Sequence, residues 1–358
     1  MKKAAGLCHL RQLCCLSIGP EMLMPSILGA LHHVIGSDSN GFFWIDDEHD
    51  ISNICAEKML PPETMQLYFR DFYGANRDGF KTRFAQIARG RPEVTRMTFP
   101  KEFYDSDYYN LIWRNLDAHH AMYAPLYANG RWIGQLSVYR SRRDPAFGEK
   151  EEQALRGVVP YIAHALGSPT PADREYTFDQ TEQRASILLT GRGKPVTFNA
   201  TARRLLFLAS HATISSGAFA MRPATSLPPE VDVLCERLAR IGADQAAPPP
   251  STTIENCWGR FTLRVDPQEG ALGDSDNLVI LHIEHHQPRE IRLLRGMQSS
   301  SLSTREREAA LPLALGRSLT EIADDLNCKH STAKYFQKQI YNKLGVHDRA
   351  GLISTLLA

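Results

Sequence analysis

Two copies of the motif Ser-x-x-Glu stand close together near the end of the sequence, Ser303 with Glu306 and Ser318 with Glu321. In such a capping box the serine oxygen accepts a hydrogen bond from an amide of the first helical turn. The glutamate accepts one from the amide of the serine. The two boxes therefore predict two short helices that begin at about residues 303 and 318.

A segment without acidic residues follows the second box. Residues 326–347 read LNCKHSTAKYFQKQIYNKLGVH and contain four lysines, although the whole chain has a formal net charge of only +1. The first residues of this segment are long enough for a tight turn, and we expect a third helix from about Ser331. A helix, a tight turn and another helix can place a recognition helix in the major groove of DNA.

The third helix is expected to have two different faces. Its apolar side consists of Ala333, Phe336, Ile340 and Leu344. At about 100° per residue, the opposite side consists of Ser331, Lys334, Tyr335, Lys338 and Asn342. An ordinary solvated face usually mixes charges of both signs, whereas lysines without carboxylates suit a groove lined by phosphates. The pattern therefore favours binding to double-stranded DNA.

The stretch LSTRERE...G.S..EIA..L....TAK.....IY.KLGV..R..L, from Leu302 to Ile353, closely resembles the helix-turn-helix domain of LuxR-type (GerE-like) transcription regulators. The resemblance implies an all-α four-helix domain at 302–358 and a dimer surface on the helix that starts near Asp348. It also implies that Thr332, Lys334, Tyr335 and Lys338 contact DNA. Together with the helical pattern and the last lysine of the segment, this predicts a DNA-binding set of Ser331, Thr332, Lys334, Tyr335, Lys338, Asn342 and Lys343.

The sequence departs from the family pattern at several positions. Pro312 falls inside the first of these helices, where a proline in the interior can cost about 3 kcal/mol. Lys329 stands where a serine usually caps the recognition helix, so we expect Ser331 or His330 to provide the cap. The sequence leaves open whether Pro312 weakens the domain.

Residues 1–168 carry a mixed α/β pattern and resemble a GAF-like sensory domain. GFFWID predicts a short buried strand, and Asn129-Gly130 between two apolar runs predicts a hairpin, because both turn residues need positive φ. FGEKEEQALRGVVPYIAHAL then predicts a helix. The segment before the hairpin, together with an amphipathic helix at the start, completes this module. The Pro- and Ser-rich stretch at 167–175 is expected to end it.

Residues 176–286 resemble a PAS-like domain. They open with a strand, a turn at Gly191 and Gly193, a second strand and a helix. GRFTLRVD and NLVILHIE then predict two further strands. Residues 287–301 are expected to be a linker that couples sensing to dimer geometry, because Ile291, Leu294 and Met297 recur at near-helical spacing. The fold class predicted for the chain is multidomain α+β.

Several other functions are disfavoured by the sequence. No G-x-S-x-G, P-loop or HExxH motif occurs, so we expect no enzyme. His282, His285 and His286 are interpreted as a solvent-exposed cluster, and no metal or cofactor is predicted. FFWIDDEHD imitates a receiver domain but lacks the later Asp that a receiver needs. Seven scattered cysteines without a CxxC pair predict reduced thiols, and no run is long enough for a membrane span; both favour the cytoplasm.

The prediction for function is a transcription regulator that senses a signal through its N-terminal modules and binds a two-fold DNA site as a homodimer. A scaffold with a degenerate helix-turn-helix, or an enzyme fused to a DNA-binding tail, remain as alternatives. Aromatic residues of the first module either form plain core or line a pocket for a small-molecule effector: Phe42, Phe43, Trp44, Tyr68, Phe69, Tyr123, Tyr127 and Trp132. The sequence does not identify the effector, the operator, or whether the protein activates or represses.

Overall fold

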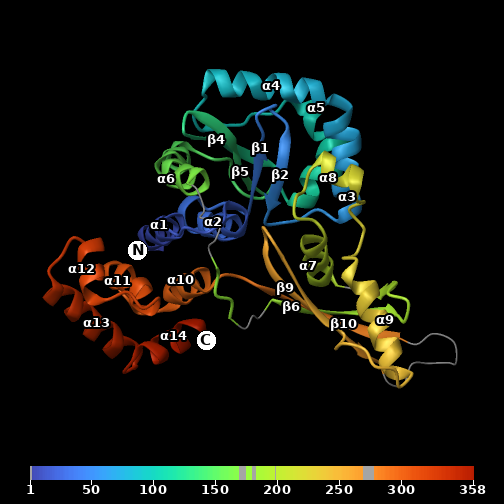
Figure 1. The fold of residues 1–358 in the computed structure, drawn as a ribbon. Coiled ribbons are helices and arrows are strands. Elements are labelled where there is room, and N and C mark those ends of the chain that lie inside the picture. Colours follow the sequence, from blue (N-terminus) through green and yellow to red (C-terminus); the bar gives the residue numbers. More distant parts are fainter. Residues whose placement is uncertain (1, 169–174, 180–182, 198, 269–277) are drawn as a thin grey trace.

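The computed structural model describes residues 2–168, 175–179, 183–197, 199–268 and 278–358. Two five-stranded antiparallel sheets, each with its own helices, occupy the described part of the chain up to residue 286, and the rest is helical. Figure 1 shows the first sheet above the second, with the C-terminal helices below the N-terminal ones. The predicted mixture of helices and strands is confirmed. In the described ranges, no helix is both long and apolar enough to cross a membrane.

The first sheet has the strand order β2-β1-β5-β4-β3. Its strands are β1 (Ser39–Ile45), β2 (Ile51–Ala56), β3 (Thr95–Arg96), β4 (His120–Ala128) and β5 (Arg131–Arg140). β4 and β5 form the predicted hairpin, and its two turn residues have positive φ, 50° at Asn129 and 80° at Gly130. The hairpin prediction is therefore confirmed together with its reason, since a two-residue turn of this kind needs that backbone conformation.

Helices cover both faces of the first sheet. They are α1 (Lys2–Cys14), α2 (Pro20–Ile35), α3 (Pro62–Leu67), η1 (Tyr68–Tyr73), η2 (Gly74–Asn76), α4 (Arg77–Gly90), α5 (Lys101–Tyr104), η3 (Tyr109–Trp113), η4 (Arg114–Leu116) and α6 (Glu149–Gly167). α2 packs against β1 and β2, and α6 against β4, whereas α4 and α5 lie across the other face (Figure 1). The expected helices at the start of the chain and at 149–167 are confirmed.

The second sheet has the order β7-β6-β10-β9-β8. Its elements are β6 (Arg184–Thr190), β7 (Pro195–Thr197), α7 (Ala200–Ser210), α8 (Ser216–Met221), α9 (Glu230–Gly242), β8 (Ser251–Asn256), β9 (Gly259–Pro267) and β10 (Leu278–His286). α7 and α9 pack against this sheet. The predicted strands are present, and Gly193 in the turn between β6 and β7 has φ of 77°. The PAS-like interpretation stays a prediction.

The interpretation of the histidines at the end of β10 as a solvent-exposed cluster is wrong for His285, and the side chain of His286 is also largely covered, with 13% exposed. Burial alternates along β10, so His285 shares the inward face with Leu281 and Ile283 and is only 4% exposed. Its Nε2 lies 2.9 Å from the carbonyl oxygen of Trp258. Burial lowers the pKa of His285 to about 4. In the described ranges, no three His, Cys, Asp or Glu residues are grouped to hold a metal ion.

The C-terminal helices are α10 (Arg289–Ser299), α11 (Thr304–Ala314), α12 (Leu319–Asp325), α13 (His330–Leu344) and α14 (Arg349–Leu357). Both predicted capping boxes are confirmed. Glu306 Oε2 accepts from the Ser303 amide at 2.7 Å, and Glu321 Oε2 from the Ser318 amide at 2.8 Å. The recognition helix differs from the expectation at its start, because Lys329 is its N-cap and makes no side-chain capping bond.

Pro312 does not interrupt α11. It lies in the last turn, where the helix continues to Ala314. The carbonyl oxygen of Pro312 accepts from the Arg317 amide at 2.9 Å, so the chain beyond the helix satisfies it. A proline close to the C-terminal end removes one amide without breaking a long run of helical hydrogen bonds, which limits its cost.

The segment predicted as a linker is the buried helix α10. Ile291, Leu294 and Met297 are each at most 1% exposed, which confirms their helical spacing. α10 packs against α1, α11 and α14, and a methyl group on Gly296 would lie only 1.8 Å from the Leu356 carbonyl oxygen. α10 therefore joins the N-terminal helices to the last helix of the chain. Most of the expected boundary at 167–175 lies outside the described residues.

Candidate functional site

The recognition helix α13 has the two predicted faces. Ala333 and Ile340 are buried, with 1% and 0% exposed surface. The predicted outward residues are all exposed: Ser331, Lys334, Tyr335, Lys338 and Asn342. Tyr335 is 58% exposed, which is unusual for so large a ring. The outward face therefore offers two ammonium groups, a phenol and two smaller hydrogen-bonding groups to an incoming molecule.

α13 packs against α11 and α12. Ile322 and Ala323 of α12 are buried, with 1% and 4% exposed surface. α13 ends at Gly345, whose φ of 66° lies in the left-handed region that glycine adopts at low cost. A short helix that is fixed by two neighbours can hold its outward side chains rigidly against a duplex.

Two members of the predicted DNA-binding set differ from the others. Thr332 is half-buried. Lys343 donates from Nζ to Glu306 Oε2 at 2.7 Å, and Glu306 is only 6% exposed. Lys343 thus fixes α13 to the start of α11, which no pattern in the sequence indicated. That these two residues contact DNA stays a prediction.

The helix predicted as a dimer surface, α14, is partly covered within the chain. Its apolar residues Leu352 and Leu356 are 0% and 3% exposed, and α14 packs mainly against α10. Its outward side consists of small or polar residues, among them Ala350, Ser354 and Thr355. Any contact of α14 with a second copy would have to use this side while α10 stays in place.

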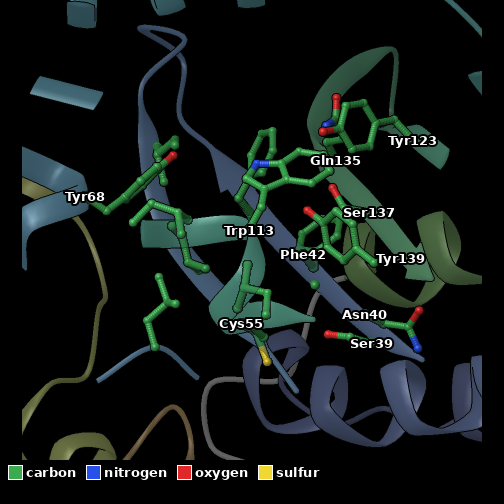
Figure 2. A pocket seen from close by; sticks show the side chains of 18 of the residues that line it. Ser39, Asn40, Phe42, Cys55, Tyr68, Trp113, Tyr123, Gln135, Ser137 and Tyr139 are labelled. Atoms are coloured by element: carbon green, nitrogen blue, oxygen red, sulfur yellow. The ribbon is translucent and has the colours of Figure 1, made fainter. Parts of the chain in front are cut away.

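A second candidate site is a cavity of about 400 Å³ in the first module. It lies between the first sheet and a cover made of η1, α4, α5 and η3. In Figure 2, Gln135, Ser137 and Tyr139 of β5 line one side of the cavity, and Tyr68 lies across from them. A volume of this size is typical of sites for small molecules.

The cavity is mainly apolar, with a few polar groups, two cationic residues (Lys58 and Arg83) and no acidic residue among the described residues of its lining. Burial raises the pKa of Tyr139, Tyr68 and Tyr123 well above the ordinary value of a tyrosine, so these phenols are neutral. Asn40 Oδ1 is buried without a hydrogen-bond partner, while its Nδ2 donates to the Leu28 carbonyl oxygen at 2.9 Å. A donor on a ligand would satisfy this oxygen.

Of the eight aromatic residues that were expected to form either core or the lining of a pocket, the structure places four in the lining of this cavity. Those that line the cavity are Phe42, Phe43, Tyr68 and Tyr123, whereas Trp44, Phe69, Tyr127 and Trp132 do not. Sequence reasoning missed a second aromatic set in the cover, Phe99, Phe103, Tyr108 and Trp113. The density of rings in FPKEFYDSDYYNLIW, which contains all four, was the available signal.

The C-terminal helices match a known family. Residues 300–356 match the model described as "Bacterial regulatory proteins, luxR family". Over 65 residues, 18% of this chain, the sequence is 40% identical to the "Probable transcriptional regulatory protein NarL" of two strains of Mycobacterium tuberculosis. The match spans only 30% of that relative's length.

Solved structures are similar at a low level only. A GAF domain/HD domain protein from Geobacter sulfurreducens is 14% identical, with a TM-score of 0.30 over 44% of this chain and 97% of that one. The VqmA dimer of Vibrio cholerae is 15% identical, with a TM-score of 0.18 over 48% of this chain and 81% of that one. At these scores the likeness carries no argument about the fold or the ligand.

Proposed function

Residues 300–356 form a domain of the LuxR family, and on that premise we propose that the chain is a transcription regulator. In this proposal α13 enters the major groove of a two-fold DNA site that two copies of the chain occupy together. The single observation that carries it is the outward face of α13, which presents Lys334 and Lys338 without an acidic residue between them. Ammonium groups there can replace the cations that surround the phosphates.

The experiment that tests this proposal is a selection of genomic fragments by the purified full-length protein. We expect a subset of fragments to bind more tightly than bulk DNA, with half-sites about 34–36 Å apart, one turn of the duplex. Binding should weaken steeply as salt is added. Equal affinity for all fragments, with and without cell extract as a source of ligand, would refute the proposal and favour the scaffold alternative.

We also propose that the cavity in the first module receives the signal. Its lining favours an uncharged molecule with an apolar body and a polar edge, because apolar rings dominate it and the phenols stay protonated. Of the two cations in the lining, Lys58 is paired with Asp117 and Arg83 is exposed to solvent. Polar groups on β5, Gln135 and Ser137, would orient such a molecule. Burying a charge in this lining without a partner would be costly.

The packing suggests how occupancy could reach the DNA-binding helices. α1 packs against α2 and α6, which cover the sheet on the face away from α4 and α5. α1 also packs against α10 and α11, and α10 packs against α14. A shift of the first sheet on ligand binding would therefore move α10 and α14 together. α14 is the helix that the dimer would use.

An enzymatic role of the cavity is not favoured by its chemistry. The cysteine in the lining, Cys55, is buried, and burial raises the pKa of its thiol to about 12. A thiol that remains protonated is a poor nucleophile. No carboxylate or histidine is among the described lining residues to serve as a general base. Binding without chemical conversion is the role that this lining supports.

A further inference from the structure

A second cavity, of about 350 Å³, lies where the two sheet modules meet the helix that leads to the DNA-binding domain. Residues of α1 and α2 line it from the first module, and α7 with the ends of β6 and β10 line it from the second. α10 closes it from the C-terminal side. Figure 1 shows α2 and α10 next to each other beside the second sheet. Three parts of the chain thus share one cavity.

Arg204 of α7 carries a buried polar atom in this lining that has no hydrogen-bond partner within the part of the chain that the structure describes. This atom is Nε of the guanidinium. The adjacent Arg203 differs, because its guanidinium lies 3.8 Å from the carboxylate of Glu63. Arg204 as a whole is half-buried, but burying its Nε–H without an acceptor is costly, so the missing acceptor needs an explanation.

The remaining lining is rich in donors. Arg295 of α10 lines the same cavity and donates to Gln287 Oε1 at 2.7 Å. His9 and His33 line it from α1 and α2, and Ser26 Oγ is buried without a hydrogen bond. No Asp or Glu is among the described lining residues. The described lining therefore carries the positive charge of Arg204 and Arg295 and no carboxylate.

The buried histidines nearby are consistent with this excess of positive charge. Burial, together with the charges of Arg307, His33 and Arg295, lowers the pKa of His9 to about 4. Burial also lowers the pKa of His285, and the charges of Arg204 and Arg295 contribute. Burial is the main cause of both shifts and the guanidinium charges add to it, so neither histidine is protonated near neutral pH.

We infer that this cavity binds a carboxylate or phosphate group of a small molecule, held by the guanidinium of Arg204 in a lining that also carries Arg295. A guanidinium donates two parallel hydrogen bonds to either group, which would satisfy the buried Nε. Because the lining comes from both sheet modules and from α10, an anion there would fasten α10 to the modules. It would act as a second input to the helix that contacts α14, separate from the cavity of the first module.

The test is thermal unfolding of the full-length protein in sodium phosphate, in sodium citrate and in sodium chloride at matched ionic strength. We expect the wild-type melting temperature to rise saturably with phosphate, with citrate or with both, beyond the effect of chloride. Arg204→Gln should weaken the apparent affinity about tenfold or more, as expected for loss of a charge-assisted pair of hydrogen bonds. Arg203→Gln, which removes the same charge from the same helix, should respond like the wild type.

The outcomes show whether the cavity binds a phosphate group, a carboxylate group or both. A response to phosphate alone, or to citrate alone, identifies the group that the cavity accepts, and a response to both supports the shared chemistry. Anions attracted by the lysines of α13 affect all variants equally, so the difference between Arg204→Gln and Arg203→Gln reports on the cavity. If Arg204→Gln does not fold, Arg295→Gln takes its place, with the same weakening expected. No response of the wild type beyond chloride, or an unchanged response of the folded variant, would overturn the inference.

Discussion

Lys343 Nζ and Glu306 Oε2 lie 2.7 Å apart and join the end of the recognition helix to the first turn of α11. The same carboxylate oxygen accepts from the Ser303 amide, so one buried group serves both the capping box and the contact between helices. Burial acts to raise the pKa of Glu306, but the hydrogen bonds from Lys343 and Ser303 outweigh it and lower the pKa below its usual value. The pair is therefore charged near neutral pH and holds the orientation of α13.

Lys343→Met should destabilise the C-terminal helices, because it leaves the Glu306 carboxylate buried without its cation. We expect a loss of about 1–3 kcal/mol in the local free energy of unfolding, read from amide hydrogen exchange in α11 and α13 at pH 7. A group whose pKa is lowered by folding contributes stability above its ordinary pKa and loses it as the pH falls. The loss should therefore shrink below about pH 4. Lys338→Met is the control, and equal exchange in both variants at pH 7 would contradict the structural role.

Gly296→Ala should destabilise the contact between α10 and α14. Alanine normally favours a helix over glycine by roughly 0.5–1 kcal/mol. Here a methyl group would lie 1.8 Å from the Leu356 carbonyl oxygen, so the two helices would have to separate. At Gly157 in α6 no atom lies within 4 Å of such a group, and Gly157→Ala should therefore stabilise the protein. Melting temperatures that rise for both variants would show that α10 and α14 do not pack this closely.

The stability of the second module should fall as the pH drops from about 6.5 to 4. The folded state lowers the pKa of His285 to about 4, mainly through burial, so the unfolded chain binds a proton in this range that the folded chain does not. Stability then rises with pH across the range, by about 3 kcal/mol for a shift of this size. His285→Gln should flatten this dependence in hydrogen exchange of β9 and β10. If the stability of the variant depends on pH as strongly as that of the wild type, a group other than His285 causes the dependence.

Ser137→Phe should fill the cavity of the first module. Ser137 lies on its wall, and a phenyl group there would take the space that a ligand needs. In a thermal-shift screen of small neutral aromatic compounds, we expect hits with the wild type and with Ser137→Ala but none with Ser137→Phe. Both variants should unfold at a temperature close to that of the wild type without compound. Hits that persist with Ser137→Phe would exclude this cavity as their site.

Local patterns predicted the elements whose geometry short stretches of sequence determine. The two capping boxes fixed the starts of α11 and α12, and Asn129-Gly130 fixed the turn of the hairpin. The helical spacing of the lysines gave the outward face of α13. Each of these depends on residues at most a few positions apart, where propensity and hydrogen bonding act directly.

Features that depend on distant parts of the chain were not predictable in the same way. Lys343 meets Glu306 across 37 positions, and nothing in either local pattern shows the contact. The burial of His285 depends on the pairing of β10 with β6 and β9. The two cavities exist only because separate elements meet, as Arg204 and Arg295 do at the junction with α10. These features depend on how distant elements pack against one another, and local sequence patterns do not show that packing.

The salt dependence of DNA binding tests the central claim most directly. For the full-length protein on its best genomic fragment, Lys334→Ala and Lys338→Ala should each weaken binding and reduce the slope of log K against log salt by about one unit. Lys150→Ala, an exposed lysine on α6, should leave both affinity and slope unchanged. If neither variant of α13 changes the slope, or if the wild type prefers no fragment over bulk DNA, the outward face of α13 does not bind a duplex and the account is wrong.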